Sequence, residues 1–340
     1  MNHAELCGSH REMGFRYGSH LAERGKFILE QVPFPLTEER RNFAAACVPV
    51  YRRFFPEILE ELEGLAAGQR CPAEDLAAVL FSMYALPPSC CCSCFAVSRD
   101  GAVLFGRNSD FLTALEEQNL NVICRPAGAA AFTGNTTAFL EMEDGVNQHG
   151  LAVGLTSVAS QAALRPGFQA GLLVRLLLER CRSTAEALAQ LARVPIASAQ
   201  TLTLADRGGD IAVAECDGER LAVCRPSRER PYVRATNVFH APGMPPFAGS
   251  EEDCWFARTR YDTLTAALDD QAARLDAAGA QALLAGKFGF LCQYDRRTGR
   301  DTVWSVVYDL GGGAVYRAEG NPSRTPFLRD RRFAFPGGNP

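Results

Sequence analysis

The sequence predicts an α+β fold in which two stacked β-sheets lie between helical layers. Over residues 1–88 the apolar side chains keep helical spacing. From Cys90 onward, short apolar runs are separated by turn residues, a pattern typical of strands. Helical patterns return at 171–181, after Ser183, at 252–268 and at 276–285. Runs of helices and strands in this order are typical of a layered domain with helices outside its sheets.

The predicted N-terminal helices are bounded by capping residues and prolines. One follows Glu12–Gly18 and is expected to run past Leu29, and another begins at Thr37, whose side chain can cap it. Pro56 either kinks this helix or begins a new one, because proline has no amide hydrogen to donate. A last helix runs over 72–86 and ends before Pro87-Pro88, which cannot continue it. Residues 1 to about 88 are therefore expected to be helical.

The predicted strands are numerous enough for two sheets. Asp100-Gly101 between two apolar runs indicates a tight hairpin. The strands are expected at 92–98, 102–107, 119–125, 130–134 and 138–142, in a hairpin of 145–147 and 151–156, and at 200–205, 210–216, 220–225, 232–236, 302–308 and 313–318.

The composition indicates the size of the core, the partners and the cellular compartment that we expect for this protein. The chain has 340 residues, of which 47% are hydrophobic, so it can bury a large core. A net charge of -4 without blocks of like charge argues against nucleic acid or a membrane surface as a partner. The thirteen cysteines and the absence of a signal-peptide pattern predict free thiols in a cytoplasmic protein. We expect no cofactor and leave homo-oligomerisation open.

The segment from Cys90 to Phe111 carries the strongest chemical signal. Cysteines head the first strand of the predicted hairpin, and the second strand ends in Arg107-Asn108-Ser109-Asp110-Phe111. The turn folds Arg107 and Asp110 back beside the cysteines. A thiol, a permanent cation and a carboxylate would then share one small volume, which is how a nucleophilic cysteine is activated.

Other interpretations of the cysteines stay open at this point. Cys91-x-x-Cys94 has the spacing of a zinc ligand pair, but no second pair completes four ligands. A redox dithiol would place this pair at a helix N-terminus, whereas here it begins a strand. The alternative from another class is therefore a non-catalytic, cysteine-rich metal-binding or redox protein.

Several motifs resemble those of N-terminal-nucleophile (Ntn) hydrolases in the choloylglycine hydrolase and isopenicillin-N acyltransferase (peptidase C45-like) group. Members begin their catalytic chain with Cys-[Ser/Thr], followed 15 or 16 residues later by [Arg/Gln]-Asn-x-Asp-[Phe/Trp], and this chain has Cys92-Ser93 and Arg107–Phe111. Four further stretches resemble the group in order: Gly8–Gly18 with Gly-x-x-x-Glu-x-Gly-x-x-x-Gly, Asn147–Val153, Ala235–Asn237 and Thr302–Asp309.

The resemblance implies an αββα sandwich and an enzyme that matures by cutting itself. Residues 1–91 would be a helical N-terminal segment, either a pro-segment or a small chain, and 92–340 the Ntn-hydrolase core. In this group the cysteine cuts the bond before it, and its freed α-amino group becomes the general base for its own thiol. The implied activity is hydrolysis of a linear amide C–N bond through a thioester. Acyl transfer to a second amine is the close alternative.

The resemblance also implies roles for individual residues. Cys92 would be the nucleophile, with Cys91 as the alternative because it matches the longer spacing of bile-salt hydrolases. Arg107 would lie beside the thiol and favour the thiolate. Asp110 would hold and orient the new α-amino group. Asn237 would donate its amide N–H to the oxyanion of the tetrahedral intermediate.

Two positions depart from the pattern of the group. Thr156 stands where the group often has an asparagine that helps to build the oxyanion hole, so the backbone N–H remains but the amide donor is lost. The group also carries an arginine on a helix after the Thr-Asn segment. Here Ala257 has the matching spacing, with Arg258 and Arg260 alongside, and we carry the role to Arg258.

The expected substrate is a small-molecule amide with an apolar acyl group. Loops at 20–40, 111–120, 130–145 and 157–170 would form its pocket. Phe34, Phe111 and Phe132 are candidates for the apolar lining.

Overall fold

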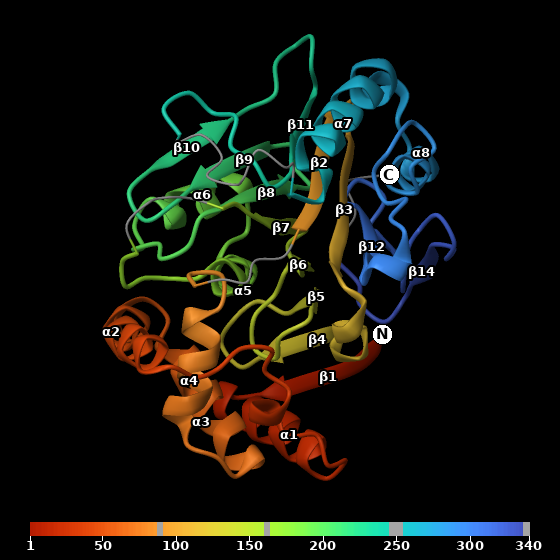
Figure 1. The fold of residues 1–340 in the computed structure, drawn as a ribbon. Coiled ribbons are helices and arrows are strands. Elements are labelled where there is room, and N and C mark those ends of the chain that lie inside the picture. The colour runs from red at the N-terminus through yellow and green to blue at the C-terminus, as the bar shows by residue number, and fades with distance from the viewer. Residues whose placement is uncertain (87–90, 160–163, 245–253, 336–340) are drawn as a thin grey trace.

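The chain folds into four layers, in which two β-sheets pack face to face and helices cover both outer faces (Figure 1). The computed structural model describes residues 1–86, 91–159, 164–244 and 254–335. Pro87, Pro88, Cys90 and the expected helix start at 252 lie outside these residues. The fold class predicted from the sequence is confirmed.

One sheet has eight strands in the order β1-β4-β5-β6-β7-β8-β9-β10, and the other has six in the order β11-β2-β3-β12-β13-β14. Neighbouring strands are antiparallel except β1 and β4, which are parallel. The strands are β1 Asn2–Gly8, β2 Cys91–Arg99, β3 Ala102–Leu112, β4 Leu120–Pro126, β5 Phe132–Thr136, β6 Asp144–Asn147, β7 Leu151–Ser157, β8 Gln200–Asp206, β9 Ile211–Cys216, β10 Leu221–Cys224, β11 Tyr232–Ala235, β12 Arg300–Asp309, β13 Ala314–Ala318 and β14 Leu328–Asp330.

Helices α1 to α6 lie on the side of the eight-stranded sheet, and α7 and α8 cover the six-stranded sheet (Figure 1). The α-helices are α1 His10–Ala22, α2 Glu38–Phe54, α3 Pro56–Gln69, α4 Ala73–Ser82, α5 Ala170–Arg180, α6 Thr184–Leu191, α7 Ala257–Gln271 and α8 Ala277–Leu284. Short 3-10 helices span Ile28–Glu30, Thr113–Gln118, Cys254–Phe256, Ala272–Arg274 and Arg296–Thr298.

Each interface between layers has its own apolar core. Alternate residues of β2 separate two of these cores, because successive side chains of a strand point to opposite faces. Cys94 and Ala96 face the other sheet, where they join Phe105 of β3. Phe95 and Val97 face α7 and α8 on the opposite side. The β2–β3 hairpin is thus buried on both faces.

The glycine motif near the N-terminus packs α1 against α3. A Cβ atom at Gly14 would lie 2.0 Å from the Glu61 carbonyl oxygen, and one at Gly64 would lie 2.1 Å from the Arg11 carbonyl oxygen. A Cβ atom at Gly18 would lie 2.5 Å from the Leu65 carbonyl oxygen of α3. The two helices can therefore approach this closely only where both lack side chains.

Buried ion pairs attach this helical segment to the rest of the fold. His10 Nε2 of α1 lies 2.9 Å from Glu179 Oε2 of α5. Arg175 Nη2, also on α5, donates to Glu61 Oε2 of α3 at 2.7 Å. Because all four side chains are buried, these contacts join residues before Cys92 to residues after it.

Three predictions about secondary structure are wrong. The first helix was expected to run past Leu29, but α1 ends at Ala22 and only the short 3-10 helix Ile28–Glu30 follows before α2. Residues Asn2–Gly8 form β1 at the edge of the eight-stranded sheet, although the first 88 residues were expected to be helical. Its pairing with β4 is a long-range contact, and only Leu6 of this strand is buried, so its local pattern is weak. Residues 138–142 form no strand, because Glu141 accepts a hydrogen bond from Gln169 and Leu140 O one from Arg175, away from the sheet.

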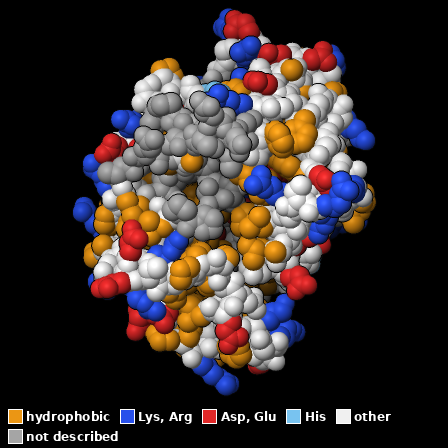
Figure 2. Space-filling model, viewed as in Figure 1, with side chains coloured by type: hydrophobic (Ala, Val, Ile, Leu, Met, Phe, Trp, Pro, Cys, Tyr) orange, Lys and Arg blue, Asp and Glu red, His pale blue; other side chains and the backbone are white. Residues whose placement is uncertain are grey.

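The visible surface has no single dominant charge. Acidic and basic side chains alternate over the face drawn in Figure 2. None of the helices in the described part of the chain has both the length and the apolarity needed to cross a bilayer.

Candidate active site

The β2–β3 hairpin places Cys92 on the face between the two sheets. Cys92 pairs with Ser109 and Cys94 with Arg107, so these four side chains share one face of the hairpin. The Cys92 side chain is fully buried, and Arg107 Nη2 donates a hydrogen bond to its Sγ at 2.7 Å. The expected contact between thiol and guanidinium is therefore present in the structure.

Arg107 is held on all sides by buried acceptors. Its Nε donates to Leu155 O at 3.1 Å, Nη1 to Asp144 Oδ2 at 2.9 Å, and Nη2 also to Glu143 Oε2 at 3.0 Å. Burial alone would lower the pKa of Arg107, but Cys92, Asp144 and Glu143 together raise it well above its ordinary value. The guanidinium is thus a fixed, permanent charge beside the thiol.

Asp144 is in turn held by the strand opposite. Trp304 Nε1 donates to Asp144 Oδ2 at 3.0 Å, and Tyr308 OH donates to Oδ1 at 2.7 Å. Glu143 accepts from Ser109 Oγ at 3.0 Å and from Thr137 Oγ1 at 2.8 Å. Each carboxylate therefore has several donors, which fixes the position of Arg107.

The other face of the hairpin carries Asp110. Cys91 is paired with Asp110 in register, and its side chain packs with Trp255 and Tyr294 on the side of α7. Tyr294 OH donates to Asp110 Oδ2 at 3.0 Å, and Thr302 Oγ1 donates to Oδ1 at 2.6 Å. Burial raises the pKa of Asp110, against the opposing effects of Arg260 and these hydroxyl donors.

Asn237 and Arg260 hold the backbone of Cys92 between the two faces. The Cys92 N–H donates to Asn237 Oδ1 at 3.1 Å, and Arg260 Nη1 donates to Cys92 O at 2.6 Å. Arg260 Nη2 also donates to Asn237 Oδ1 at 2.8 Å, and its Nη1 lies 3.5 Å from Asp110 Oδ2. Asn237 Nδ2 donates to Ser157 O at 2.8 Å. The backbone nitrogen of Cys92, which would become the α-amine, is thus hydrogen-bonded to Asn237.

Thr156 lies next to the segment that contains Asn237, and its side chain contacts the backbone of that segment. The Thr156 hydroxyl donates to Thr236 O at 2.6 Å and lies 2.8 Å from Thr201 Oγ1. Its side chain is fully buried at the end of β7. Thr156 therefore positions the residue before Asn237.

Among the two arginines near the start of α7, the structure brings Arg260 into the cluster. Arg258 is exposed, whereas Arg260 is fully buried. Residues two apart on a helix point in widely different directions, so both cannot face Asp110. Arg260 Nε donates to Trp255 O at 2.8 Å, and Trp255 and Phe256 have φ values of 54° and 56°. This left-handed turn sets where α7 begins.

The geometry argues against a shared metal or redox role for Cys91 and Cys94. Their side chains lie on opposite faces of β2. Burial raises the pKa of Cys94 to about 12, so its thiol stays protonated at neutral pH. The metal-type cluster found among the described residues, His10, Glu61 and Glu179, contains no cysteine and already holds Arg175.

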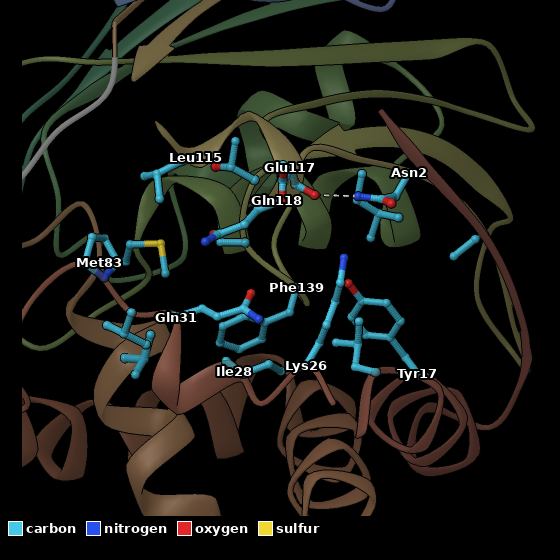
Figure 3. Close-up of a pocket in the computed structure, with 18 of the residues that line it drawn as sticks. Asn2, Tyr17, Lys26, Ile28, Gln31, Met83, Leu115, Glu117, Gln118 and Phe139 are labelled. Carbon is cyan, nitrogen blue, oxygen red and sulfur yellow. Dashed lines mark hydrogen bonds between the residues drawn. The ribbon is translucent and has the colours of Figure 1, made fainter. Parts of the chain in front are cut away.

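A pocket of about 240 Å³ opens between the N-terminal segment and the core (Figure 3). Three of the four expected loop regions contribute to it, and Phe34 and Phe111 line it. Phe132 does not line it and instead packs in the core under Arg175. Thr137 of the pocket wall reaches Cys92 through Glu143 and Arg107. A chain of three hydrogen bonds therefore links the pocket wall to the thiol, although Cys92 itself is not among the residues that line the pocket.

Sequence reasoning missed Glu143, Asp144, Arg260 and Tyr294. A signal existed for the first two, because three carboxylates fall within Glu141–Asp144 directly before a buried hairpin. Thr302 and Trp304 lie in a stretch that was recognised only as a strand. Tyr294 lies in an irregular segment before β12, where no local pattern indicates a site.

Known proteins resemble this chain in fold. An N-acylethanolamine-hydrolyzing acid amidase ortholog from Caenorhabditis elegans is 16% identical, covers 64% of this chain and 92% of its own, and has a TM-score of 0.47. A variant of conjugated bile acid hydrolase from Clostridium perfringens is 13% identical, with coverages of 73% and 99% and a TM-score of 0.46. Penicillin V acylase from Agrobacterium tumefaciens is 13% identical, with coverages of 73% and 100% and a TM-score of 0.35.

A family model identifies the chain more directly. No curated protein sequence matches it. Residues 97–324, about two-thirds of the chain, match the model described as acyl-coenzyme A:6-aminopenicillanic acid acyl-transferase. The match begins just after Cys92 and includes Arg107, Asp110 and Asn237. The chain therefore belongs to the acyl-coenzyme A:6-aminopenicillanic acid acyl-transferase family.

Proposed function

We propose that this protein is a cysteine Ntn amidohydrolase whose nucleophile is Cys92. The observation that carries the proposal is the 2.7 Å contact between Arg107 Nη2 and Cys92 Sγ at the start of β2. A fixed guanidinium stabilises the thiolate, which is the reactive form of cysteine. Cys91 is the weaker candidate, because its side chain lies on the opposite face of the strand with Trp255 and Tyr294.

The proposed maturation cuts the chain between Cys91 and Cys92. The Cys92 thiol attacks the Cys91 carbonyl, the C–N bond breaks, and the released nitrogen takes a proton to become the α-amine of Cys92. Water then hydrolyses the resulting thioester and frees residue 91. Asn237 Oδ1 already accepts a hydrogen bond from this nitrogen, so it would hold the new amine. Asp110, on the other side of the backbone, lies 3.5 Å from Arg260 Nη1 and would balance that positive charge beside the new amine.

In the mature enzyme the α-amine takes the proton from the Cys92 thiol, and the thiolate attacks the amide carbonyl of the substrate. A free α-amine has a pKa of about 7.7–8.0, so it can act as a base near neutral pH. The tetrahedral intermediate collapses to a thioester as the leaving amine takes the proton. Water then attacks the thioester, releases the carboxylic acid and restores the thiol.

The apolar pocket supports an apolar acyl group on the substrate. Most of its lining side chains are aliphatic or aromatic, and Figure 3 shows Ile28 and Phe139 bordering the cavity. A cavity of about 240 Å³ gives room for an acyl chain of several carbon atoms. We therefore propose medium-length N-acyl amides as substrates.

Acyl transfer is the second candidate, because the matching family model describes an acyl-transferase. The two activities share the thioester and differ in the group that attacks it. A second amine that reaches the thioester before water would give transfer.

The experiment is a single-turnover reaction of purified protein with an N-octanoyl amide, followed by mass spectrometry of the protein. We expect released amine and a transient octanoyl adduct on the peptide that begins at Cys92. Added hydroxylamine should divert the adduct to a hydroxamate if acyl transfer is efficient. Release of amine with no adduct on Cys92, or an adduct on Cys94, would contradict the assignment.

A further inference from the structure

Cys91, the residue before the proposed cleavage site, packs into a group of aromatic side chains. It is buried against Trp255 and Tyr294, and Phe290 packs on the same group. The ring centroids of Trp255 and Tyr294 lie 5.6 Å apart, and those of Phe290 and Tyr294 lie 5.4 Å apart. Phe256 meets Phe290 at 5.0 Å. All three pairs are edge to face, the geometry that aromatic rings prefer, and we call these four side chains the aromatic cluster.

The backbone that carries two of these rings is strained and held in place. Trp255 and Phe256 have φ values of 54° and 56°, which bulky side chains rarely adopt. The Trp255 carbonyl oxygen accepts from Arg260 Nε at 2.8 Å and from Tyr294 OH at 3.2 Å. The Arg300 guanidinium lies 5.0 Å from the centroid of the Trp255 ring. Strain of this kind is typical of ligand sites, and the proposed reaction has not yet given these rings a role.

The chemistry of the leaving amine points to the aromatic cluster. When the tetrahedral intermediate collapses, the C–N bond breaks and the amine nitrogen takes the proton from the α-ammonium of Cys92, while the acyl group stays on Sγ. The leaving nitrogen must therefore come within hydrogen-bond reach of Cys92 N. Asn237 Oδ1 already holds one side of this nitrogen at 3.1 Å. In the uncut chain, residue 91 is bonded to the same nitrogen, and its release frees the volume beside Trp255 and Tyr294.

We propose that after maturation the aromatic cluster binds the amine side of the substrate, so that the preferred substrates are amides of arylalkyl amines. Trp255 and Phe290 are the specificity-determining residues, because an aromatic ring placed where residue 91 was would extend their edge-to-face row. Phe256 is 50% exposed, so the cluster reaches the surface and gives the released amine a way out. This inference rests on the proposed amidase function, because it names the group that leaves as the thioester forms.

The test compares the N-octanoyl amides of 2-phenylethylamine and of ethylamine. Both give the same octanoyl thioester, so a difference in kcat/KM arises before the amine has left. For the processed wild type we expect kcat/KM to be roughly tenfold higher for the 2-phenylethylamide, in the range of a partly buried aromatic ring.

Two phenylalanines of one segment supply the variant and its control. Phe290→Leu keeps an apolar side chain but removes the ring, so it should reduce the preference roughly threefold, the range of one aromatic pair. Its rate on the ethylamide should stay within about threefold of the wild type, which also shows that the variant folds. Phe288→Leu is the matched control and should keep the full preference, because Phe288 is 42% exposed and lies outside the aromatic cluster.

The outcomes separate this inference from the proposed function. Equal kcat/KM for the two amides in the wild type, or a preference that Phe290→Leu leaves unchanged, overturns the inference while the amidase function stands. If the processed protein hydrolyses neither amide, calorimetry decides. Roughly tenfold tighter binding of the 2-phenylethylamide, reduced by Phe290→Leu, would support the aromatic cluster as a binding site although the amidase function fails, and equal binding would overturn it. A protein that stays uncut keeps residue 91 against the aromatic cluster and contradicts the inference.

Discussion

The two faces of β2 differ in what they hold. The face between the sheets presents the Cys92 thiol to a guanidinium that Glu143 and Asp144 fix in place. The face toward α7 presents Asp110 to Arg260 and Tyr294, and Arg260 also donates to the backbone carbonyl of Cys92. One face thus prepares the nucleophile, and the other positions the peptide bond and the future amine.

The largest expected effect separates the two cysteines on these faces. Cys92→Ala should abolish amide hydrolysis and processing, because it removes the proposed nucleophile, the thiol that accepts the hydrogen bond of Arg107 Nη2. Cys91→Ala should keep hydrolysis within several-fold of the wild type, since its side chain packs with Trp255 and Tyr294 on the face of β2 away from Arg107. Initial rates on an N-octanoyl amide measure both. The reverse order of effects would move the nucleophile to Cys91.

A large effect is also expected from the α7 face. Asp110→Asn should lower kcat by roughly 10²–10⁴, the range of a lost acid–base function, while the fold persists. The neutral amide cannot balance Arg260 or hold an ammonium. Steady-state kinetics on processed protein measure this change. A kcat within threefold of the wild type would show that this face has no part in catalysis.

Asp110 also gives a prediction about stability. Burial raises the pKa of Asp110 above its ordinary value of 3.8, so the native state binds this proton more tightly than the unfolded state. Its contribution to stability is therefore present below pH 3.8 and is lost as the pH rises through the raised pKa. Relative to Asp110→Asn, the wild type should lose unfolding free energy over that range, as measured by denaturant titration. A constant difference between the two proteins would contradict the assigned direction.

The two arginines of α7 test which side chain of this helix positions the Cys92 backbone. Arg260→Gln should lower kcat/KM by at least tenfold, because Cys92 O, Asn237 and Asp110 all lose a contact. Arg258→Gln is the matched control on the same helix and should change kcat/KM less than threefold, since its side chain is exposed. Circular dichroism checks that both variants fold. Equal losses, or a larger loss at Arg258, would contradict the geometry.

The smallest expected effect lies outside the site. Gly14→Ala places a Cβ 2.0 Å from the Glu61 carbonyl oxygen, so α1 must move away from α3. We expect about 1–3 kcal/mol of lost unfolding free energy, as for other overpacked sites. Gly279→Ala in α8 is the control, because its nearest neighbour is a Leu275 side-chain atom at 3.1 Å. A variant at Gly14 as stable as this control would contradict the close packing.

Local patterns in the sequence were enough to predict the hairpin that brings Arg107 to Cys92. The Asp100-Gly101 turn fixes the register, and two buried strands follow from their apolar residues. The resemblance supplied Asn237, which lies far away in sequence but accepts the Cys92 N–H. The approximate position of the pocket was also predicted, including Phe34 and Phe111.

The remaining features depend on contacts that no local pattern specifies. The choice of Arg260 over Arg258 follows from the left-handed turn at Trp255-Phe256, which sets the phase of α7. The strand β1 exists because β4 offers an edge to pair with. Glu143 and Asp144 become part of the site only when β6 packs across from β3 and β12.

The central claim is that Cys92 becomes the N-terminus of the catalytic chain. Intact mass spectrometry of the purified protein, with N-terminal sequencing, tests it most directly. The account predicts two associated chains, residues 1–91 and 92–340, held together by the pairing of β1 with β4 and by the buried pairs of His10 with Glu179 and Arg175 with Glu61. A second chain beginning at Cys91 would shift the nucleophile by one residue. A single uncut and fully active species would contradict the account.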